Sequence, residues 1–318
     1  MSTPVLIAVG GNSLIRAGQQ GTISEQLGNA RPISRGVVAL IKEGVPVLLT
    51  HGNGPQVGAA LLRSERAAGQ VYEQRLDVCV ASTQGEIGYL LQQSLSQELA
   101  AAALPVPVVA VLTQVVVADD DPAFRLPTKP IGPFYSRAEA EDKWRRWGWQ
   151  MVEDAARGFR RVVASPEPRE IVEEQAIRRM LDQEILVIAM GGGGIPVVRE
   201  DGILRGADAV IDKDRASVLL AMRLGLERVI FSTDADYVYV NFRKPSQQAI
   251  ERATANEMKA YLAAGHFPAG NMGPKIEAAL RFLQNGGREV VVTSHERVAD
   301  AFHGRTGTRI VSSSSQEK

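Results

Sequence analysis

Three glycine-rich turns each follow an apolar run that favours a buried strand. They are GGNSL at 10–14, HGNGPQVG at 51–58 and GGGGIP at 191–196. The free main-chain N–H groups of such turns favour anions. One glycine turn is typical of an ordinary tight connection, but three together favour an anion site. Each glycine costs roughly 0.5–1 kcal/mol relative to alanine, so the four consecutive glycines also indicate that something lies close against the backbone.

Two lysines stand where a helix dipole disfavours a cation. Lys213, in AVIDKDRASVLLAM, is at a predicted helix start, and Lys275 follows Pro274, which is expected at the first helical position. A cation there costs typically 0.3–1 kcal/mol, so the pair favours phosphate binding. Asp212 reads as a helix cap. Asp214 either balances local charge or holds Lys213 and a second lysine in position.

Residues 120–165 differ in composition from the rest of the chain, because they hold all three tryptophans and several prolines. Such a segment is too long for a simple connection. We interpret it as a small subdomain or a lid with an aromatic core. Lys129, in PTKPIGP, lies between prolines that restrict its backbone, which suits a side chain that must point to one place.

Polar residues in STDADYVYV (232–240) are candidates for contacts to a nucleotide base and ribose, although this stretch taken alone favours an ordinary turn. The four histidines show no metal-ligand spacing, and we interpret His51 as a structural residue. Cys79 reads as a small buried hydrophobe.

The elements that position these residues are predicted from alternating apolar and helical patterns. Apolar runs that favour strands lie at 4–9, 45–50, 106–117, 184–190, 228–233 and 289–294. Helical patterns lie between them, and one ends at Gly225. This alternation predicts a parallel sheet covered on both faces. Ligands of such sheets bind beyond the carboxyl ends of the strands, so we expect the three glycine turns to meet at one edge.

Composition restricts the class of protein. The 318 residues suit one large α/β unit or two domains, and 36 Lys+Arg against 36 Asp+Glu give no case for a nucleic-acid or membrane-surface partner. A single cysteine excludes a disulfide framework and a Cys-rich zinc site. The N-terminus lacks the pattern of a signal peptide, and Pro105 and Pro107 split the apolar run 99–118 into a helix end and a strand. We therefore expect a cytoplasmic protein.

Known nucleotide fingerprints do not fit the chain. The P-loop pattern G-x-x-x-x-G-K-[ST] is absent, and GNGPQVG spaces its glycines as G-x-G-x-x-x-G, on the second predicted strand rather than the first. A dehydrogenase stays open as a weaker alternative.

The motifs resemble those of the carbamate kinases, a branch of the amino acid kinase family. The resemblance covers nearly the whole chain and is carried, in family order, by GGNSL, THGNGPQVG, LDVCVASTQGEIGYLL, LTQVVV, PTKPIGPF, GGGGIPVV, VIDKDRAS, DADYVYV and GHFPAGNMGPKIEAA. THGNGPQVG with PTKPIGPF separates carbamate kinases from acetylglutamate and uridylate kinases. The departures are small: Ser13 replaces the usual alanine, and the loop 16–32 is not distinctive.

The resemblance implies an open three-layer αβα sandwich with a mainly parallel sheet. It also implies a single domain over 1–318, a protruding lid subdomain at 120–165, and a homodimer. The implied reaction is ATP + carbamate ⇌ ADP + carbamoyl phosphate, often run toward ATP. Mg²⁺ would be held mainly by the phosphates and water, with no metal ligands assigned to the protein.

The resemblance also implies roles for individual residues. The catalytic residues would be Lys129, Lys213, Asp214 and Lys275. Phosphate and carbamate would be bound by Gly10, Gly11, Asn12, Gly52, Asn53, Gly191, Gly192, Gly193 and Gly194. The nucleotide is assigned to Thr233, Asp234, Asp236, Tyr237, Met272 and Pro274. In this interpretation the backbone amides of the four glycines reach the small reactant where a Cβ would intrude.

Two alternatives share the fold. The acceptor could be another small carboxylate or a phosphonate, although the glycine-lined site argues against bulky acceptors. The chain could instead be a sensor that binds nucleotide without turnover, against which stands the presence of all four catalytic-type residues.

Overall fold

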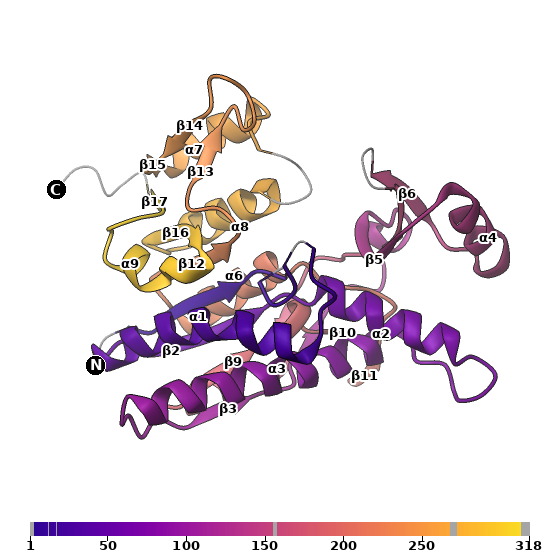
Figure 1. Ribbon diagram of the computed structural model, residues 1–318, viewed down its shortest axis with the longest axis horizontal. Coiled ribbons are helices and arrows are strands. Elements are labelled where there is room, and N and C mark those ends of the chain that lie inside the picture. The colour runs from indigo at the N-terminus through magenta and orange to yellow at the C-terminus, as the bar shows by residue number, and fades with distance from the viewer. Residues whose placement is uncertain (1–2, 12, 17, 155–157, 268–271, 313–318) are drawn as a thin grey trace.

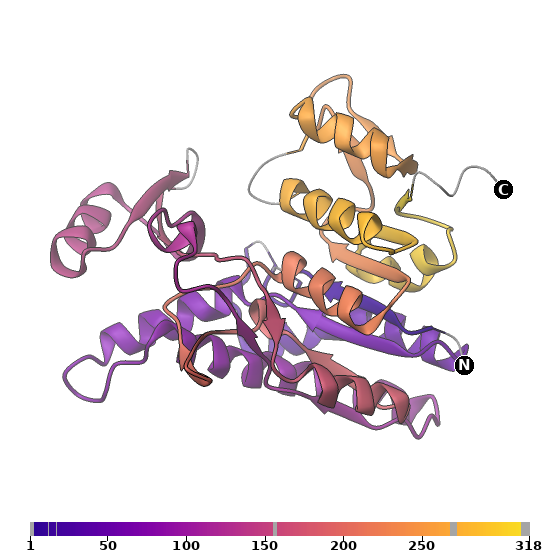
Figure 2. The same cartoon turned by 180° about the vertical axis from the view of Figure 1, so that it is seen from behind.

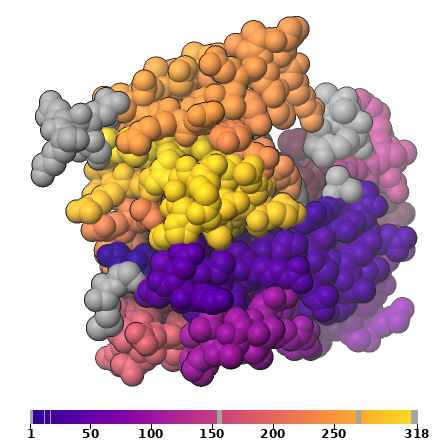
Figure 3. Space-filling model, turned by 60° about the vertical axis from the view of Figure 1, so that its left-hand side comes forward, coloured from indigo at the N-terminus to yellow at the C-terminus, as the bar shows by residue number. Residues whose placement is uncertain are grey.

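The computed structural model describes residues 3–11, 13–16, 18–154, 158–267 and 272–312. Figure 1 shows a layered main body and a smaller part, formed by residues 129–163, that projects from one side. In Figure 3 the yellow and orange C-terminal residues stack above the indigo N-terminal ones. Asn12, assigned above to phosphate binding, lies outside the described residues.

An eight-stranded sheet forms the centre of the main body. Its order is β15 (Arg252–Thr254), β17 (Thr308–Val311), β16 (Glu289–Ser294), β12 (Arg228–Thr233), β1 (Val5–Val9), β2 (Val47–His51), β9 (Leu186–Ala189) and β3 (Val108–Ala110). All neighbouring pairs are parallel except β16 with β17. The prediction of a mainly parallel central sheet is confirmed.

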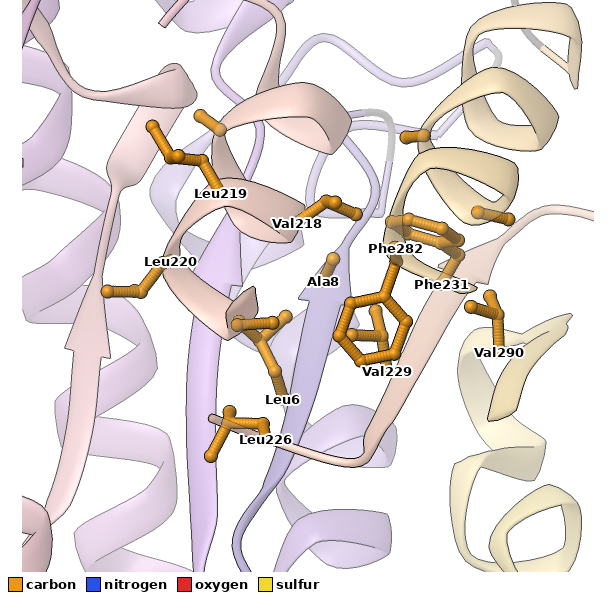
Figure 4. Close-up of a cluster of buried hydrophobic side chains, with 14 of the residues drawn as sticks. Leu6, Ala8, Val218, Leu219, Leu220, Leu226, Val229, Phe231, Phe282 and Val290 are labelled. Carbon is orange, nitrogen blue, oxygen red and sulfur yellow. The ribbon is translucent and has the colours of Figure 1, made fainter. Parts of the chain in front are cut away.

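The two faces of this sheet are covered by different helices, because alternate residues of a strand point to opposite sides. Val5 and Ile7 of β1 pack in a core with α1, α3 and α9, whereas Leu6 and Ala8 pack in a second core with α5, α6 and α8. Figure 4 shows Leu6 and Ala8 on the side of α6, and Figure 2 shows α6 and α8 over that face. The bounds are α1 (Ile23–Lys42), α3 (Leu76–Ala101), α9 (Val298–Phe302), α5 (Glu174–Asp182), α6 (Lys213–Leu224) and α8 (Met272–Gln284). The predicted αβα sandwich is confirmed.

The run 106–117 is not the single strand that its apolar residues predict. It forms β3 in the main sheet and β4 (Gln114–Val116) in a second sheet of order β11, β10, β4 and β8. Between the two strands, Gln84 of α3 accepts from Thr113 N at 2.8 Å and donates to Thr113 O at 3.1 Å. Thr113 O also accepts from Ile195 N of β10 at 2.8 Å, so the Gln84 side chain bonds the residue at which the chain passes from the main sheet to the second one. The other strands are β8 (Glu170–Ile171), β10 (Ile195–Glu200) and β11 (Ile203–Gly206).

The projecting part is a three-stranded antiparallel sheet with one helix. It contains β5 (Lys129–Tyr135), α4 (Arg137–Trp147), β6 (Met151–Asp154) and β7 (Gly158–Val163), after the short helix η1 (Pro122–Phe124). Ser136 and Glu139 form a capping box at the start of α4. Trp149 is buried against Tyr135 and Trp147, whereas Trp144 is exposed. The aromatic core exists, but Trp149 is the only one of the three tryptophans that is buried, because Trp147 is exposed as well as Trp144.

The remaining elements flank these layers. They are α2 (Gly54–Arg66), the hairpin β13 (Val238–Val240) with β14 (Gln248–Ile250), α7 (Ala255–Ala263), and the short helices η2 (Gly191–Gly193) and η3 (His295–Arg297). Cys79 is buried as predicted, in a cluster that includes Val57 of α2 and Ile131 of β5.

No helix within the described ranges is long and apolar enough to span a membrane. The apolar run 99–118 is divided as expected. Helix α3 ends at Ala101 and β3 begins at Val108, with both prolines between them.

Candidate functional site

The three glycine turns meet at one edge of the main sheet. They follow β1, β2 and β9, which are consecutive in the sheet, so their carboxyl ends lie side by side. Gly52 N donates to Val9 O at 3.0 Å, and a Cβ placed on Gly52 would lie 2.6 Å from Gly11 Cα. The first two turns therefore touch backbone to backbone.

The four-glycine turn packs closely against other parts of the chain. Gly192, Gly193 and Gly194 all have positive φ, which glycine adopts without strain. Added Cβ atoms would collide with other parts of the chain: at Gly191 with His51 and Gln84, at Gly192 with Asn53, at Gly193 with Ile211, and at Gly194 with Val115. Internal packing is thus sufficient to require the glycines. The expectation that something lies close against this backbone is met by the protein's own atoms, and contact of these glycines with a ligand stays a prediction.

Asn53 joins the second turn to helix α3. Its Nδ2 donates to Thr83 Oγ1 at 2.9 Å, its side chain is buried, and α2 begins at the next residue with Pro55 in its first turn. Within the described residues, this is the only one of the three glycine turns that leads directly into an α-helix.

Lys213, Asp214 and Lys275 form a buried cluster. Asp214 Oδ1 lies 2.9 Å from Lys213 Nζ, and Asp214 Oδ2 accepts from Lys275 Nζ at 3.1 Å. All three residues are less than 10% exposed. Burial by itself would raise the pKa of Asp214, but the two ammonium groups hold it below its usual value. Burial and the neighbouring Lys275 lower the pKa of Lys213, although Asp214 opposes this.

The lysine cluster lies at the same edge as the glycine turns. Lys213 Nζ donates to Ala8 O at 3.5 Å, two residues before Gly10. The four-glycine turn packs on residues 211 and 212, directly before Lys213. The structure therefore brings together the turns and the two lysines that the sequence singled out.

Lys129 reaches this edge from the projecting part. Its Nζ donates to Asp212 Oδ2 at 3.0 Å. Asp212 also caps α6, because its Oδ1 accepts from Asp214 N and Arg215 N. Although burial raises the pKa of Asp212, Lys129 and the helix amides hold it far below its usual range. The sequence identified the cap but not the ion pair.

The residues assigned to the nucleotide follow β12, the next strand beyond β1. Thr233 is buried, and Asp234 accepts from His295 Nε2 at 3.1 Å, which lowers the pKa of Asp234. Asp236 contacts Arg297 at 3.9 Å, and Tyr237 Oη accepts from Thr306 at 3.4 Å.

Helix α8 is described from Met272, so Pro274 is not its first residue as predicted, but at least its third. Lys275 stays in the described first turn of α8. Met272 and Pro274 therefore lie at the same end of α8 as the lysine cluster.

Sequence reasoning interpreted His51 as structural and gave no role to His295. His295 hydrogen-bonds Ser232 through Nδ1 and lies under Gly10, where an added Cβ would be 3.2 Å from its Cε1. His51 is buried, and its Nδ1 donates to Gly52 O at 3.1 Å. Burial, aided by Lys213, lowers the pKa of His51 to about 4. The sequence signal for the position of each histidine is its place relative to an apolar run: His51 ends β2, and His295 directly follows β16.

An αβα sandwich with glycine turns and buried lysines at one sheet edge defines an α/β protein built to bind anions. The model of the amino acid kinase family matches residues 3–294, and the chain belongs to this family. It is 43% identical to a carbamate kinase of Thermococcus kodakarensis, covering 96% of this chain and 98% of that one. It is 45% identical to a carbamate kinase of Staphylococcus haemolyticus, with the same coverage. The structure is similar to that of a carbamate kinase from Giardia lamblia bound to AMP-PNP, with a TM-score of 0.91 and 41% identity over 98% of this chain and 99% of that one.

Proposed function

We propose that this chain is a carbamate kinase, which transfers a phosphoryl group reversibly between ATP and carbamate and runs mainly toward ATP. The observation that carries the proposal is Asp214 holding Lys213 and Lys275 at the edge where three glycine turns meet. The relatives' names supply the acceptor, because the geometry alone identifies an anion site rather than one particular anion.

Phosphoryl transfer requires the protein mainly to position the reactants and to neutralise their negative charge. Toward ATP, the bond between phosphorus and the carbamate oxygen breaks, and a bond to an oxygen of the ADP β-phosphate forms. Carbamate leaves as an anion, so no strong general acid or base is required. Two unit anions about 4 Å apart repel by roughly 4 kcal/mol at an effective dielectric of about 20. The positive charges of Lys129, Lys213 and Lys275 offset this repulsion.

The residues of the site have different roles in the reaction. Lys213 and Lys275 contact the transferring phosphoryl group, and Asp214 fixes both ammonium groups before substrate arrives, so little reorganisation is needed. Lys129 reaches the reactants from the projecting part. Phosphate is bound by Gly10, Gly11 and Asn12, and carbamate by Gly52, Asn53 and the glycines at 191–194.

The nucleotide lies beyond β12 in this proposal, against Thr233, Asp234, Asp236, Tyr237, Met272 and Pro274. Mg²⁺ bound with the nucleotide would supply neutralisation of phosphate charge. The carboxylates nearest the lysines do not form a separate metal cage, because Asp212 and Asp214 are already paired with lysines. Phosphate oxygens and water would therefore hold the ion.

The proposal includes the single domain 1–318 with a lid at 120–165, and a homodimer.

One face of helix α3 supports the dimer. Exposed positions on one side of α3 are uncharged from Val78 to Ser96, namely Val78, Ser82, Gly85, Tyr89 and Ser96. Long uncharged stripes on a surface helix suit contact with another protein surface.

The test is ATP formation by the purified protein. Carbamoyl phosphate, ADP and Mg²⁺ should give ATP in a luciferase assay, and omission of any one should abolish it. A protein that binds ADP but makes no ATP would contradict the proposal and favour a nucleotide sensor.

ADP release from ATP with carbamate, acetate or a phosphonate as acceptor tests the acceptor class. Faster turnover with either of the latter two would also contradict it.

A further inference from the structure

Helix α2 and strand β5 meet backbone to backbone at two glycines. Gly58, in the buried face of α2, has helical backbone angles, and a Cβ placed on it would overlap the Cα and N atoms of Gly132. Gly132 has φ +74° and lies where the pairing of β5 with β7 is irregular, between Ile131 and Tyr135. We propose that Gly58 is a positioning residue, which seats β5 so that Lys129 reaches the anion site. This proposal deepens the proposed function and rests on it for the role of Lys129.

The path from Gly58 to Lys129 is short and stiff. Lys129 is the first residue of β5, three positions before Gly132, and it pairs with Val163 of β7. Ile131, next to the glycine contact, is buried in a core shared with Val57 of α2. A displacement of β5 at Gly132 is therefore carried along the strand to Lys129, whose Nζ lies 3.0 Å from Asp212 Oδ2.

A second contact keeps the projecting part from simply swinging away. Glu65, near the end of α2, lies between Lys143 of α4 at 3.7 Å and Arg161 of β7 at 4.0 Å. Lys143 Nζ lies over the rings of Tyr135, Trp147 and Trp149 at 4.6 to 4.9 Å. With α2 held at both places, an added side chain at position 58 must shift β5 locally.

The expected shift is large enough to matter for catalysis. Non-bonded carbon atoms prefer about 3.5–4.0 Å, so a methyl group at position 58 requires movement on the order of 1 Å. A misplacement of about 1 Å can cost on the order of 100-fold in rate. If Gly58 only allowed close packing of α2, Lys129 would keep its position in Gly58→Ala, and its contribution to the rate of ATP formation would not change.

The experiment compares Gly58→Ala with a matched control. Gly28→Ala places the same methyl group inside α1, where nothing lies within 4 Å of it. We expect Gly58→Ala to lower ATP formation from carbamoyl phosphate at least about tenfold and to leave ADP affinity unchanged. Gly28→Ala should leave both unchanged. In the Lys129→Ala background, Gly58→Ala should cause no further loss. Additive losses would overturn the proposal, because Gly58 would then act independently of Lys129.

A second readout does not depend on the reaction. The reactivity of Lys129 toward an amine-labelling reagent, followed by mass spectrometry, should rise in Gly58→Ala and stay at the wild-type level in Gly28→Ala. Wild-type protein without ATP formation would refute the proposed function, while the labelling result would still decide the role of Gly58. Unchanged labelling in folded Gly58→Ala would overturn the inference. If that variant does not fold, Gly132→Ala strains β5 through its positive φ instead, and unchanged labelling there would overturn it equally.

Discussion

Lys129 donates to Asp212 at 3.0 Å, although 83 positions separate the two residues in the chain. This bond joins the projecting part to the main body at the edge where the glycine turns meet. The same carboxylate caps α6 through its other oxygen. One aspartate therefore sets both the start of the helix that carries Lys213 and the position of the lysine that arrives from outside.

The two tasks of Asp212 can be separated by substitution. Asp212→Asn keeps a side-chain oxygen that can cap α6 but removes the charge that pairs with Lys129, so it should lose only the ion pair's contribution to stability, and ATP formation should fall because Lys129 loses its charged partner. Asp212→Ala removes the cap as well and should lower the free energy of unfolding by a further ~1 kcal/mol. Urea unfolding and the luciferase assay measure the two effects. Wild-type turnover in Asp212→Asn would contradict the role of the ion pair.

The buried lysines should be individually necessary for turnover. Lys213→Ala and Lys275→Ala should each reduce ATP formation by at least about tenfold, the cost of losing one charge-stabilising contact. Lys244→Ala, at an exposed position, is the matched control and should be neutral. Near-normal turnover in both site variants would refute the assignment.

Asp214 should matter for stability as well as for rate. Asp214→Ala leaves Lys213 and Lys275 buried without their shared carboxylate, and breaking a buried pair typically costs about 3–5 kcal/mol. We expect a reduced free energy of unfolding in urea at pH 7. Asp234→Ala, at a largely exposed carboxylate, is the comparison and should cost much less. Equal stability of the two variants would show that the cluster does not depend on Asp214.

His51 predicts a pH dependence of stability. Its pKa is about 4 in the folded protein and about 6.5 when unfolded. Between these values the unfolded chain binds more protons, so stability is lost as the pH falls. The contribution between pH 7 and pH 5 is about 2 kcal/mol. Urea unfolding of wild type and His51→Asn at both pH values measures it. The variant should show the smaller loss, and identical losses would contradict the prediction.

The uncharged side of α3 predicts where two copies of the chain meet. Tyr89→Arg places a charge on that stripe and should shift the protein from dimer to monomer in size-exclusion chromatography with light scattering. Tyr72→Arg makes the same change at an exposed tyrosine that precedes α3 and should have no effect. A monomeric wild type, or a dimeric Tyr89→Arg, would refute this surface.

Much of the fold could be predicted because its signals are local. The apolar runs at 4–9 and 228–233 became β1 and β12, and Asp212 and Gly225 do cap α6 as their positions indicate. Local signals failed at 106–117, where a continuous apolar run is split between two sheets by Gln84, a residue more than 20 positions away. Periodicity contains no information about such a distant hydrogen-bond partner.

The sequence by itself determined the types of residue that could neutralise phosphate charge, and the alternation of strands and helices predicted a parallel sheet whose carboxyl ends bring the glycine turns to one edge. Only the tertiary structure decided which carboxylate holds which lysine, that His51 stays neutral, and that packing against the protein itself requires the four glycines. The reason is physical: helix and turn preferences act over a few residues, whereas ion pairing, burial and steric exclusion depend on atoms that the chain brings together from far apart.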